Sequence, residues 1–269
     1  MIAILRALPM GPTVTLSWRR SAHVIERNVM NYRRNWFYLV SGFFEPLFYL
    51  LAVGAGVGRL VGTVQTSGHS VSYAAFVAPG LLASAAMNGA IFDATYNFFF
   101  KLKVERTYEA MLATPLSVMD VAIGELGWTL VRGMLYAGGF LAIMAVFGDC
   151  HSYDAMLCLP AAMLITLAFA AIGLALTSYM SQWQHLGTVA LAVLPLFLFS
   201  GTFYGLDAYP GWLQEVVRCS PLYQGVALLR ALALGHLSAL LLIHVLYLVL
   251  LILFGLFVVS RRLARVLTP

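Results

Sequence analysis

The stretch Ala155–Met180, AMLCLPAAMLITLAFAAIGLALTSYM, decides the fold class because it contains no charged residue. It is longer than the run of about 20 apolar residues that a helix needs to cross the hydrocarbon core of a bilayer. The bilayer core offers no water to pair with peptide groups, so such a stretch crosses it as a helix. The sequence therefore predicts an integral membrane protein.

The rest of the chain has the same character. Of its 269 residues, 61% are hydrophobic and only 10% are charged, and the mean hydropathy is +0.87. Soluble domains carry about 25% charged residues. Five further apolar stretches reach spanning length: Trp36–Val57, Ala74–Phe100, Val121–Phe147, Leu186–Leu206 and Leu237–Ser260. We therefore predict an all-α membrane protein with six transmembrane helices in one domain, residues 36–260, between an N-terminal segment, residues 1–35, and a basic tail, residues 261–269.

Lysines and arginines set the predicted orientation. Most of the 16 lie in three segments: Arg6–Arg34, Lys101–Arg106 and Arg261–Arg265. With six alternating spans, all three segments fall on one side, which the positive-inside rule assigns to the cytoplasm. Both termini are then cytoplasmic. This one-sided distribution accounts for the net charge of +5, so we expect no nucleic-acid partner.

Three connections carry structure of their own. Residues Thr13–Arg34 mix apolar side chains with arginines, which predicts an amphipathic helix in contact with lipids at the membrane interface. Residues Lys101–Leu112 hold good helix formers and mixed charges, and they predict a short cytoplasmic helix. Residues Asp207–Gly235 are apolar but are broken by Pro210 and Pro221, which favours two short outer re-entrant helices.

Three charged residues fall inside the predicted spans: Glu45, Asp93 and Arg132. A charge at the bilayer centre costs about 2.5–3.5 kcal/mol on insertion scales, so each needs a reason. Counting from the cytoplasmic ends of their spans places all three at similar depth, with two acids and one base. We favour a mutually neutralising cluster that holds the first three spans together. A polar lining of the substrate path or a proton relay is the alternative.

Two pairs of glycines have the spacing that lets helix backbones approach closely. Gly54 and Gly58 end the first predicted span, and Gly201 and Gly205 end the fifth. They indicate either packing within the chain or a contact between two copies.

Motifs of catalysis are missing from the sequence. It contains no G-x-x-x-x-G-K-[ST] phosphate loop, no H-E-x-x-H and no G-x-S-x-G. We therefore expect no catalytic residue, no metal site and no cofactor in this chain. Cys150 and Cys219 lie in predicted outer loops, where free thiols are favoured over a bridge.

Two stretches resemble the permease subunit of ABC-2 type exporters. The first is ERTYEAMLATPLSVMDVAIGE, Glu105–Glu125. The second is FLFSGTFYGLDAYPGWLQ, Phe197–Gln214, followed by SPLYQGVALLRALALG, Ser220–Gly235. The chain departs from the family at Gly205, where proline is common.

The resemblance implies a complex in the bacterial inner membrane. Two permease copies, a homodimer rather than a heterodimer, would each dock a cytoplasmic ABC ATPase that binds ATP and Mg²⁺. The helix Lys101–Leu112 would couple the subunits through Lys103, Glu105, Arg106 and Glu109. Family substrates are amphipathic or lipid-linked and move outward; they include drugs, lipids, glycolipids and polysaccharides.

Two other functions compete with this reading. A stand-alone proton-coupled transporter would use the three intramembrane charges as its relay. An intramembrane lipid-modifying transferase would need convergent polar groups, for which Asp149, His151 and Asp154 are weak candidates. A neighbouring reading frame that encodes an ATPase would favour the exporter.

Overall fold

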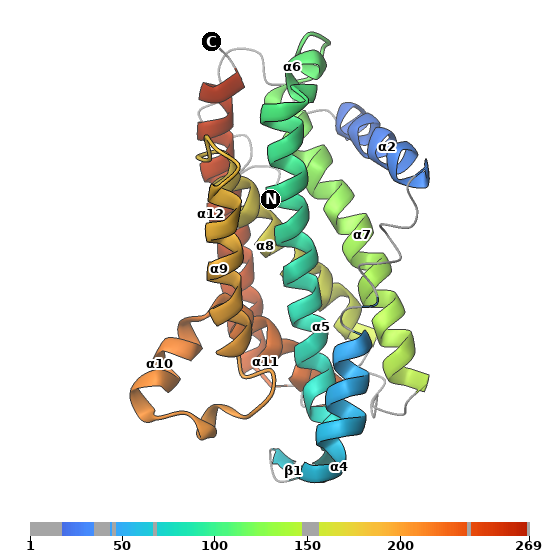
Figure 1. Cartoon of the computed structure of the whole chain (residues 1–269), viewed down its shortest axis with the longest axis vertical. Coiled ribbons are helices and arrows are strands. Elements are labelled where there is room, and N and C mark those ends of the chain that lie inside the picture. Colours follow the sequence, from blue (N-terminus) through green and yellow to red (C-terminus); the bar gives the residue numbers. More distant parts are fainter. Residues whose placement is uncertain are drawn as a thin grey trace.

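The structure is a computed structural model that describes residues 18–34, 44, 47–66, 69–146, 156–235 and 238–267. Its long helices lie side by side in one bundle (Figure 1). The elements in chain order are α2 (Trp18–Arg34), η1 (Ala52–Val57), α4 (Gly58–Val61), β1 (Thr63–Thr66), β2 (His69–Ser72), α5 (Tyr73–Phe92), η2 (Asp93–Asn97), η3 (Phe100–Val104), α6 (Thr107–Leu112), α7 (Val118–Val146), α8 (Cys158–Thr177), α9 (His185–Leu198), η5 (Leu206–Ala208), α10 (Gly211–Cys219), α11 (Pro221–Ala233) and α12 (Leu240–Leu267). The elements η1, η2 and η3 are π-helical, and η5 is a 3₁₀ turn.

Among the described residues, four helices are long and apolar enough to cross a membrane, and they coincide with the second, third, fourth and sixth predicted spans. They are Tyr73–Val104, Val118–Ala145, Cys158–Thr177 and Leu240–Arg262. The other two predicted spans correspond to shorter apolar helices, Leu47–Val61 and His185–Leu198. Most of the first half of the predicted first span lies outside the described residues. The chain is therefore a helical membrane protein, and the count of six spans stays a prediction.

Helix α9 ends earlier than the hydropathy predicted. The apolar run continues to Leu206, but the helix stops at Leu198. The Ser200 hydroxyl donates to the Phe197 carbonyl at 2.8 Å, a local bond that competes with helix continuation. Gly201 follows with φ +70°, in the left-handed region that favours glycine. The apolar residues after Leu198 therefore leave the helix and form a non-helical turn. Hydropathy alone does not distinguish these two conformations.

Helix α8 forms the centre of the bundle and packs against α5, α7, α11 and α12. Small residues make the close approach possible. A Cβ added at Gly255 of α12 would lie 2.7 Å from the carbonyl carbon of Ala171, and one added at Gly133 of α7 would lie 2.7 Å from the Thr166 side chain. Helices α7 and α12 therefore approach α8 so closely that a residue larger than glycine at position 133 or 255 would clash with α8.

Helix α2 lies outside the bundle, against α7 (Figure 1). Its contact face includes Val24, which is only 1% exposed. A Cβ at Gly124 of α7 would lie 2.5 Å from the Val24 Cβ, so the two helices touch nearly backbone to backbone. The opposite face exposes Trp18 and Met30. The predicted amphipathic N-terminal helix is therefore present, with its inner face docked on α7.

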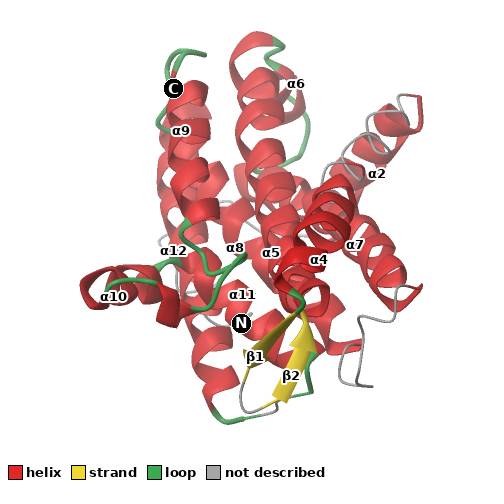
Figure 2. Ribbon diagram, turned by 60° about the horizontal axis from the view of Figure 1, so that its bottom comes forward, coloured by secondary structure: helices red, strands yellow, loops and turns green. Residues whose placement is uncertain are grey.

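A β-hairpin at the end of the bundle opposite α6 was not predicted (Figures 1 and 2). Its antiparallel strands pair Thr63 with Ser72 and Val64 with Val71. Ser72 also caps α5, since its hydroxyl accepts a hydrogen bond from the Ala75 amide at 3.1 Å. The hairpin therefore leads directly into the longest membrane helix.

The predicted outer segment folds as two short helices, α10 and α11, divided at Pro221. In Figure 1, α10 projects from the bundle beside α9, while α11 packs beneath the bundle. Arg230 of α11 fixes this arrangement. Its guanidinium donates to the carbonyls of Phe76 at 3.1 Å, Gly201 at 2.7 Å and Thr202 at 3.2 Å. One side chain thus ties α11 to the start of α5 and to the turn after α9.

Candidate functional site: the charged tip and two buried polar clusters

The segment between the second and third predicted spans differs from the single helix expected over Lys101–Leu112. The helix of α5 continues through η3, and the chain then breaks at Arg106, whose φ is +51°. A second helix, α6, begins at Thr107. Next to the break, the Thr107 hydroxyl donates to the Glu105 carboxylate at 3.1 Å, a local bond typical of non-helical backbone. The prediction of one continuous helix was therefore wrong.

The four residues predicted to contact an ATPase lie around this break: Lys103, Glu105, Arg106 and Glu109. All four side chains are exposed. We call residues 103–109 the charged tip. It lies at one end of the bundle, opposite the β-hairpin (Figure 1).

Tyr108 anchors the charged tip to the bundle. It is fully buried, and its ring centroid lies 5.0 Å from that of Phe98. Burial raises the pKa of the Tyr108 phenol well above its ordinary value, and the nearby Glu125 carboxylate raises it further. The tip therefore combines an exposed charged face with one deeply buried neutral anchor.

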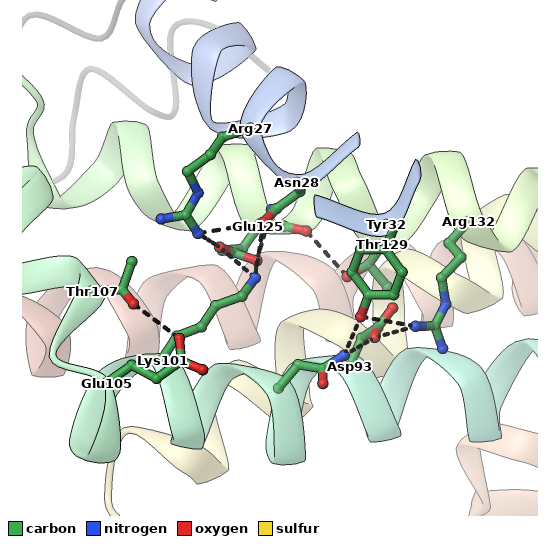
Figure 3. Close-up of polar contacts among 11 residues, drawn as sticks. Arg27, Asn28, Tyr32, Asp93, Lys101, Glu105, Thr107, Glu125, Thr129 and Arg132 are labelled. Carbon is green, nitrogen blue, oxygen red and sulfur yellow. Dashed lines mark hydrogen bonds and ion pairs between the residues drawn. The ribbon is translucent and has the colours of Figure 1, made fainter. Parts of the chain in front are cut away.

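Beneath the tip lies a largely buried group of polar side chains that we call the Glu125 cluster, in which Asn28, Lys101 and Glu125 are shielded and Arg27 lies at the exposed edge (Figure 3). The Lys101 ammonium donates to the two Glu125 carboxylate oxygens at 3.0 and 2.8 Å. It also donates to the side-chain amide oxygen of Asn28 at 3.0 Å. The Asn28 amide donates to Glu125 at 3.2 Å, and Arg27 lies 4.0 Å from the same carboxylate. The cluster joins α2, η3 and α7.

A second link joins α2 to the connection between α6 and α7. The Arg20 guanidinium donates to the Pro115 carbonyl at 2.7 Å and lies 3.7 Å from the Asp120 carboxylate. Asp120 and Ser117 exchange side chain to backbone hydrogen bonds at 3.0 and 3.2 Å, which begins α7 with a capping box. Helix α2 is therefore bound to the region after the tip as well as to the Glu125 cluster.

Deeper in the bundle lies the Asp93 cluster: Tyr32, Asp93, Asn97 and Arg132. Figure 3 labels Tyr32, Asp93 and Arg132 of this cluster. Arg132 lies 2.6 Å from Asp93, and both side chains are less than a tenth exposed. The Asn97 amide donates to Asp93 and, at 2.8 Å, to the Tyr32 hydroxyl. Two of the three predicted intramembrane charges are thus brought together, and Glu45 lies outside the described residues.

Two members of the Asp93 cluster were missed in the sequence. Asn97 follows Asp93 by four residues, a spacing that places both on one helix face and that could have identified it. Asp93–Asn97 is π-helical, a local geometry often found at functional sites. Tyr32 carries no such signal, because it belongs to the interfacial helix α2. Burial and the Asp93 carboxylate raise the pKa of the Tyr32 phenol, which stays a neutral hydrogen-bonding partner.

A cavity of about 880 Å³ borders the Asp93 cluster. Its polar wall includes Asn88, Asp93 and Arg132, and its apolar wall includes Val193 and Phe197 of the α9 region. Pockets of this size accommodate small-molecule ligands.

The glycine pairs divide between different roles. Gly201 lies in the turn after α9, and Gly205 lies just before η5, so the two do not lie on a helix as their spacing had suggested, and a contact between two copies at these positions stays a prediction. A Cβ at Gly54 would lie 3.4 Å from Ala74, which makes this glycine a contact within the chain. Among the described residues, a Cβ at Gly58 would meet only the Val53 carbonyl of its own helix, at 3.8 Å, and one at Gly205 would meet nothing within 4 Å.

Four further candidate residues lie outside the described part of the chain: Asp149, Cys150, His151 and Asp154. Cys219 is an exposed free thiol. Within the described ranges, no group of three or more acidic, histidine or cysteine side chains is arranged to hold a metal ion.

Comparison with known proteins assigns the chain to a family. Residues 22–234 match the ABC-2 type transporter family. Nodulation protein J of Rhizobium leguminosarum bv. trifolii is 34% identical over 71% of this chain and 72% of its own length. The protein of the same name from R. leguminosarum bv. viciae is 31% identical over 82% of this chain and 86% of its own. Inner membrane transport permease YadH of Escherichia coli K12 is 23% identical over 77% and 80%. The chain therefore belongs to the ABC-2 type transporter family and is a transporter permease.

Proposed function

We propose that this chain is the membrane subunit of an ATP-driven exporter in the bacterial inner membrane. It moves an amphipathic or lipid-linked substrate out of the cytoplasm, and a separate ABC ATPase supplies the energy. Family membership supports the ATPase partner. The name of the YadH relative, an inner membrane transport permease, supports the location.

The observation that carries this proposal is the charged tip. Lys103, Glu105, Arg106 and Glu109 all expose their side chains at one end of the bundle. Mixed charges on an exposed surface suit a polar and reversible contact between proteins. The positive-inside rule places this end in the cytoplasm, where ATP and its ATPase are found. Two permease copies would each bind one ATPase, with Gly58 and Gly205 as candidate contacts between the copies.

The cavity beside the Asp93 cluster supports the substrate class. Its walls combine buried charged and amide groups with apolar side chains. An amphipathic molecule satisfies both kinds of wall, whereas a small inorganic ion would leave the apolar one unused. The pairing of Asp93 with Arg132 favours a neutral polar lining over the proton relay of a stand-alone transporter.

Charge reversal at the tip tests the ATPase contact. The variant Glu105→Lys with Arg106→Glu keeps the net charge but inverts the pattern at the tip. We expect it to lower co-purification of the ATPase and the ATP turnover of the complex. The matched control is Glu215→Lys with Arg218→Glu on α10, an exposed ion pair at 2.9 Å on the proposed outer side. Equal effects of both reversals, or ATPase binding untouched by the first, would contradict the proposal.

A further inference from the structure

We infer that Lys101 and Glu125 are positioning residues that transmit movement of the charged tip to the membrane helices. This inference rests on the proposed function, since it takes an ATPase to be the agent that moves the tip. It assigns a role to two residues that were not among the expected coupling residues.

The two residues occupy the two ends of the connection that contains the tip. Lys101 lies in η3 just before the tip, and Glu125 lies in α7 after it, 24 positions later. Their side chains meet at 2.8 Å and are only 12% and 8% exposed. An ion pair shielded from water resists stretching more strongly than an exposed one, because solvent screening is weaker. The Lys101–Glu125 ion pair therefore joins the segment before the charged tip directly to the helix after it.

Helix α2 shares this link. Asn28 accepts a hydrogen bond from Lys101 and donates one to Glu125, so it binds both members of the pair. Val24 of α2 packs against Gly124, the residue before Glu125. A force on the tip is thus delivered at one point to α2, to the end of the α5 helix and to the start of α7.

Stability alone gives a poor reason for the pair. Replacing a buried ion pair with uncharged residues of similar volume is often neutral or stabilising, because the charges no longer lose their hydration. The helices that carry the pair are already held by apolar packing, since α5 and α7 both pack on α8. Transmission, in contrast, requires a directional link between segments that move.

The decisive variant removes both charges together. Lys101→Met with Glu125→Gln abolishes the ion pair, and the new amide keeps a hydrogen bond to Asn28 within reach. We expect this variant to assemble with its ATPase and to unfold at the wild-type temperature. Lys101→Arg, which preserves the pair, is the matched control and should behave as wild type.

The readout is the movement of the spans in the assembled permease–ATPase complex. Spin labels are attached at Leu135 of α7 and Leu191 of α9, both exposed on the surface of the chain, in a chain whose native cysteines are replaced by serine. Adding Mg·ATP with vanadate should shift the distance between labels in wild type and in Lys101→Arg. The double variant should hydrolyse ATP but lose that shift.

Each outcome decides a separate question. A full shift in the double variant overturns the positioning role. A lowered unfolding temperature with loss of ATPase binding also overturns it, because the pair would then act as a structural support. If wild-type chain binds no ATPase or shows no shift, the proposed function itself fails, and this inference fails with it.

Discussion

The Arg132 guanidinium and the Asp93 carboxylate lie 2.6 Å apart and join the helix of α5 to α7 inside the bundle. Either charge alone would be costly within a bilayer. Together they form a neutral pair. The Tyr32 hydroxyl accepts hydrogen bonds from Asn97 at 2.8 Å and from Arg132 at 3.5 Å, and these bonds extend the pair to α2. The pair thus connects two membrane helices and helix α2 inside the bundle.

We expect the single variants Asp93→Asn and Arg132→Gln to be less stable than the double variant. Each single change leaves one buried charge without its partner, which costs about 3–5 kcal/mol in buried pairs. The double change leaves neither charge. Thermal unfolding in detergent, followed for all four members of the cycle, measures the coupling. Arg218→Gln, which breaks an exposed pair on α10, is the control and should change stability by about 1 kcal/mol or less. Additive effects of the two single changes would exclude the neutral pair as a stabilising contact.

Hydropathy and charge predicted much of this arrangement. Four spans lie where apolar runs were found, because a run long enough to cross a bilayer has no other stable environment. The pairing of Asp93 with Arg132 followed from their similar depth and opposite charge. The amphipathic pattern of residues 13–34 likewise predicted a helix, which the structure has at α2, but it did not predict that one face of this helix packs on α7.

Other features depend on local geometry or on contacts between distant segments, and the sequence pattern does not contain them. The break at Arg106 replaces an expected helix because that residue adopts a left-handed conformation. Helix α9 stops short because Ser200 and Gly201 redirect the backbone among residues that remain apolar. Tyr32 joins Asn97 only because α2 folds back onto α7.

Labelling in intact cells tests the predicted orientation. The native cysteines are first replaced by serine, because Cys219 is itself an exposed thiol. We then expect a cysteine at Gln65, exposed in the β-hairpin, to react with a membrane-impermeant maleimide. A cysteine at Lys103 in the charged tip should react only after the membrane is opened. The two positions lie at opposite ends of the bundle, on either side of the span Tyr73–Val104, so a reversed orientation of the chain would exchange their labelling. Reaction of the tip cysteine in intact cells would contradict the cytoplasmic assignment and the ATPase contact together.

Gly124→Ala should displace α2 from α7. The new Cβ would lie 2.5 Å from the Val24 Cβ, and overpacking of this kind costs about 1–3 kcal/mol. Gly138→Ala is the matched control on the same helix, because a Cβ there meets nothing within 4 Å. A cysteine at position 24 reports the displacement, since Val24 is 1% exposed and its replacement should react with maleimide only when α2 has moved. Equal labelling rates in the two alanine variants would show that the close approach is not needed to hold α2.

Arg230→Gln should loosen the contact of α11 with the start of α5 and with the turn after α9. The arginine donates to the carbonyls of Phe76, Gly201 and Thr202, and it stacks on the Phe76 ring with its guanidinium carbon 3.9 Å from the centroid. A glutamine is shorter, uncharged and unable to reach three carbonyls at once. Hydrogen bonds to charged groups contribute about 1.5–3 kcal/mol each, so a loss of about 2 kcal/mol or more is expected from thermal unfolding.

Arg230→Lys separates charge from geometry at the same position. Lysine keeps the positive charge but offers a single ammonium in place of the planar fork, so it should recover only part of the lost stability. Protease accessibility of the turn after α9 provides a second measurement, because that turn supplies two of the three carbonyls. If lysine restores full stability and protection, the charge alone holds α11 in place. If neither variant alters the turn, the outer helices are fixed by apolar packing, and Arg230 does not set their position.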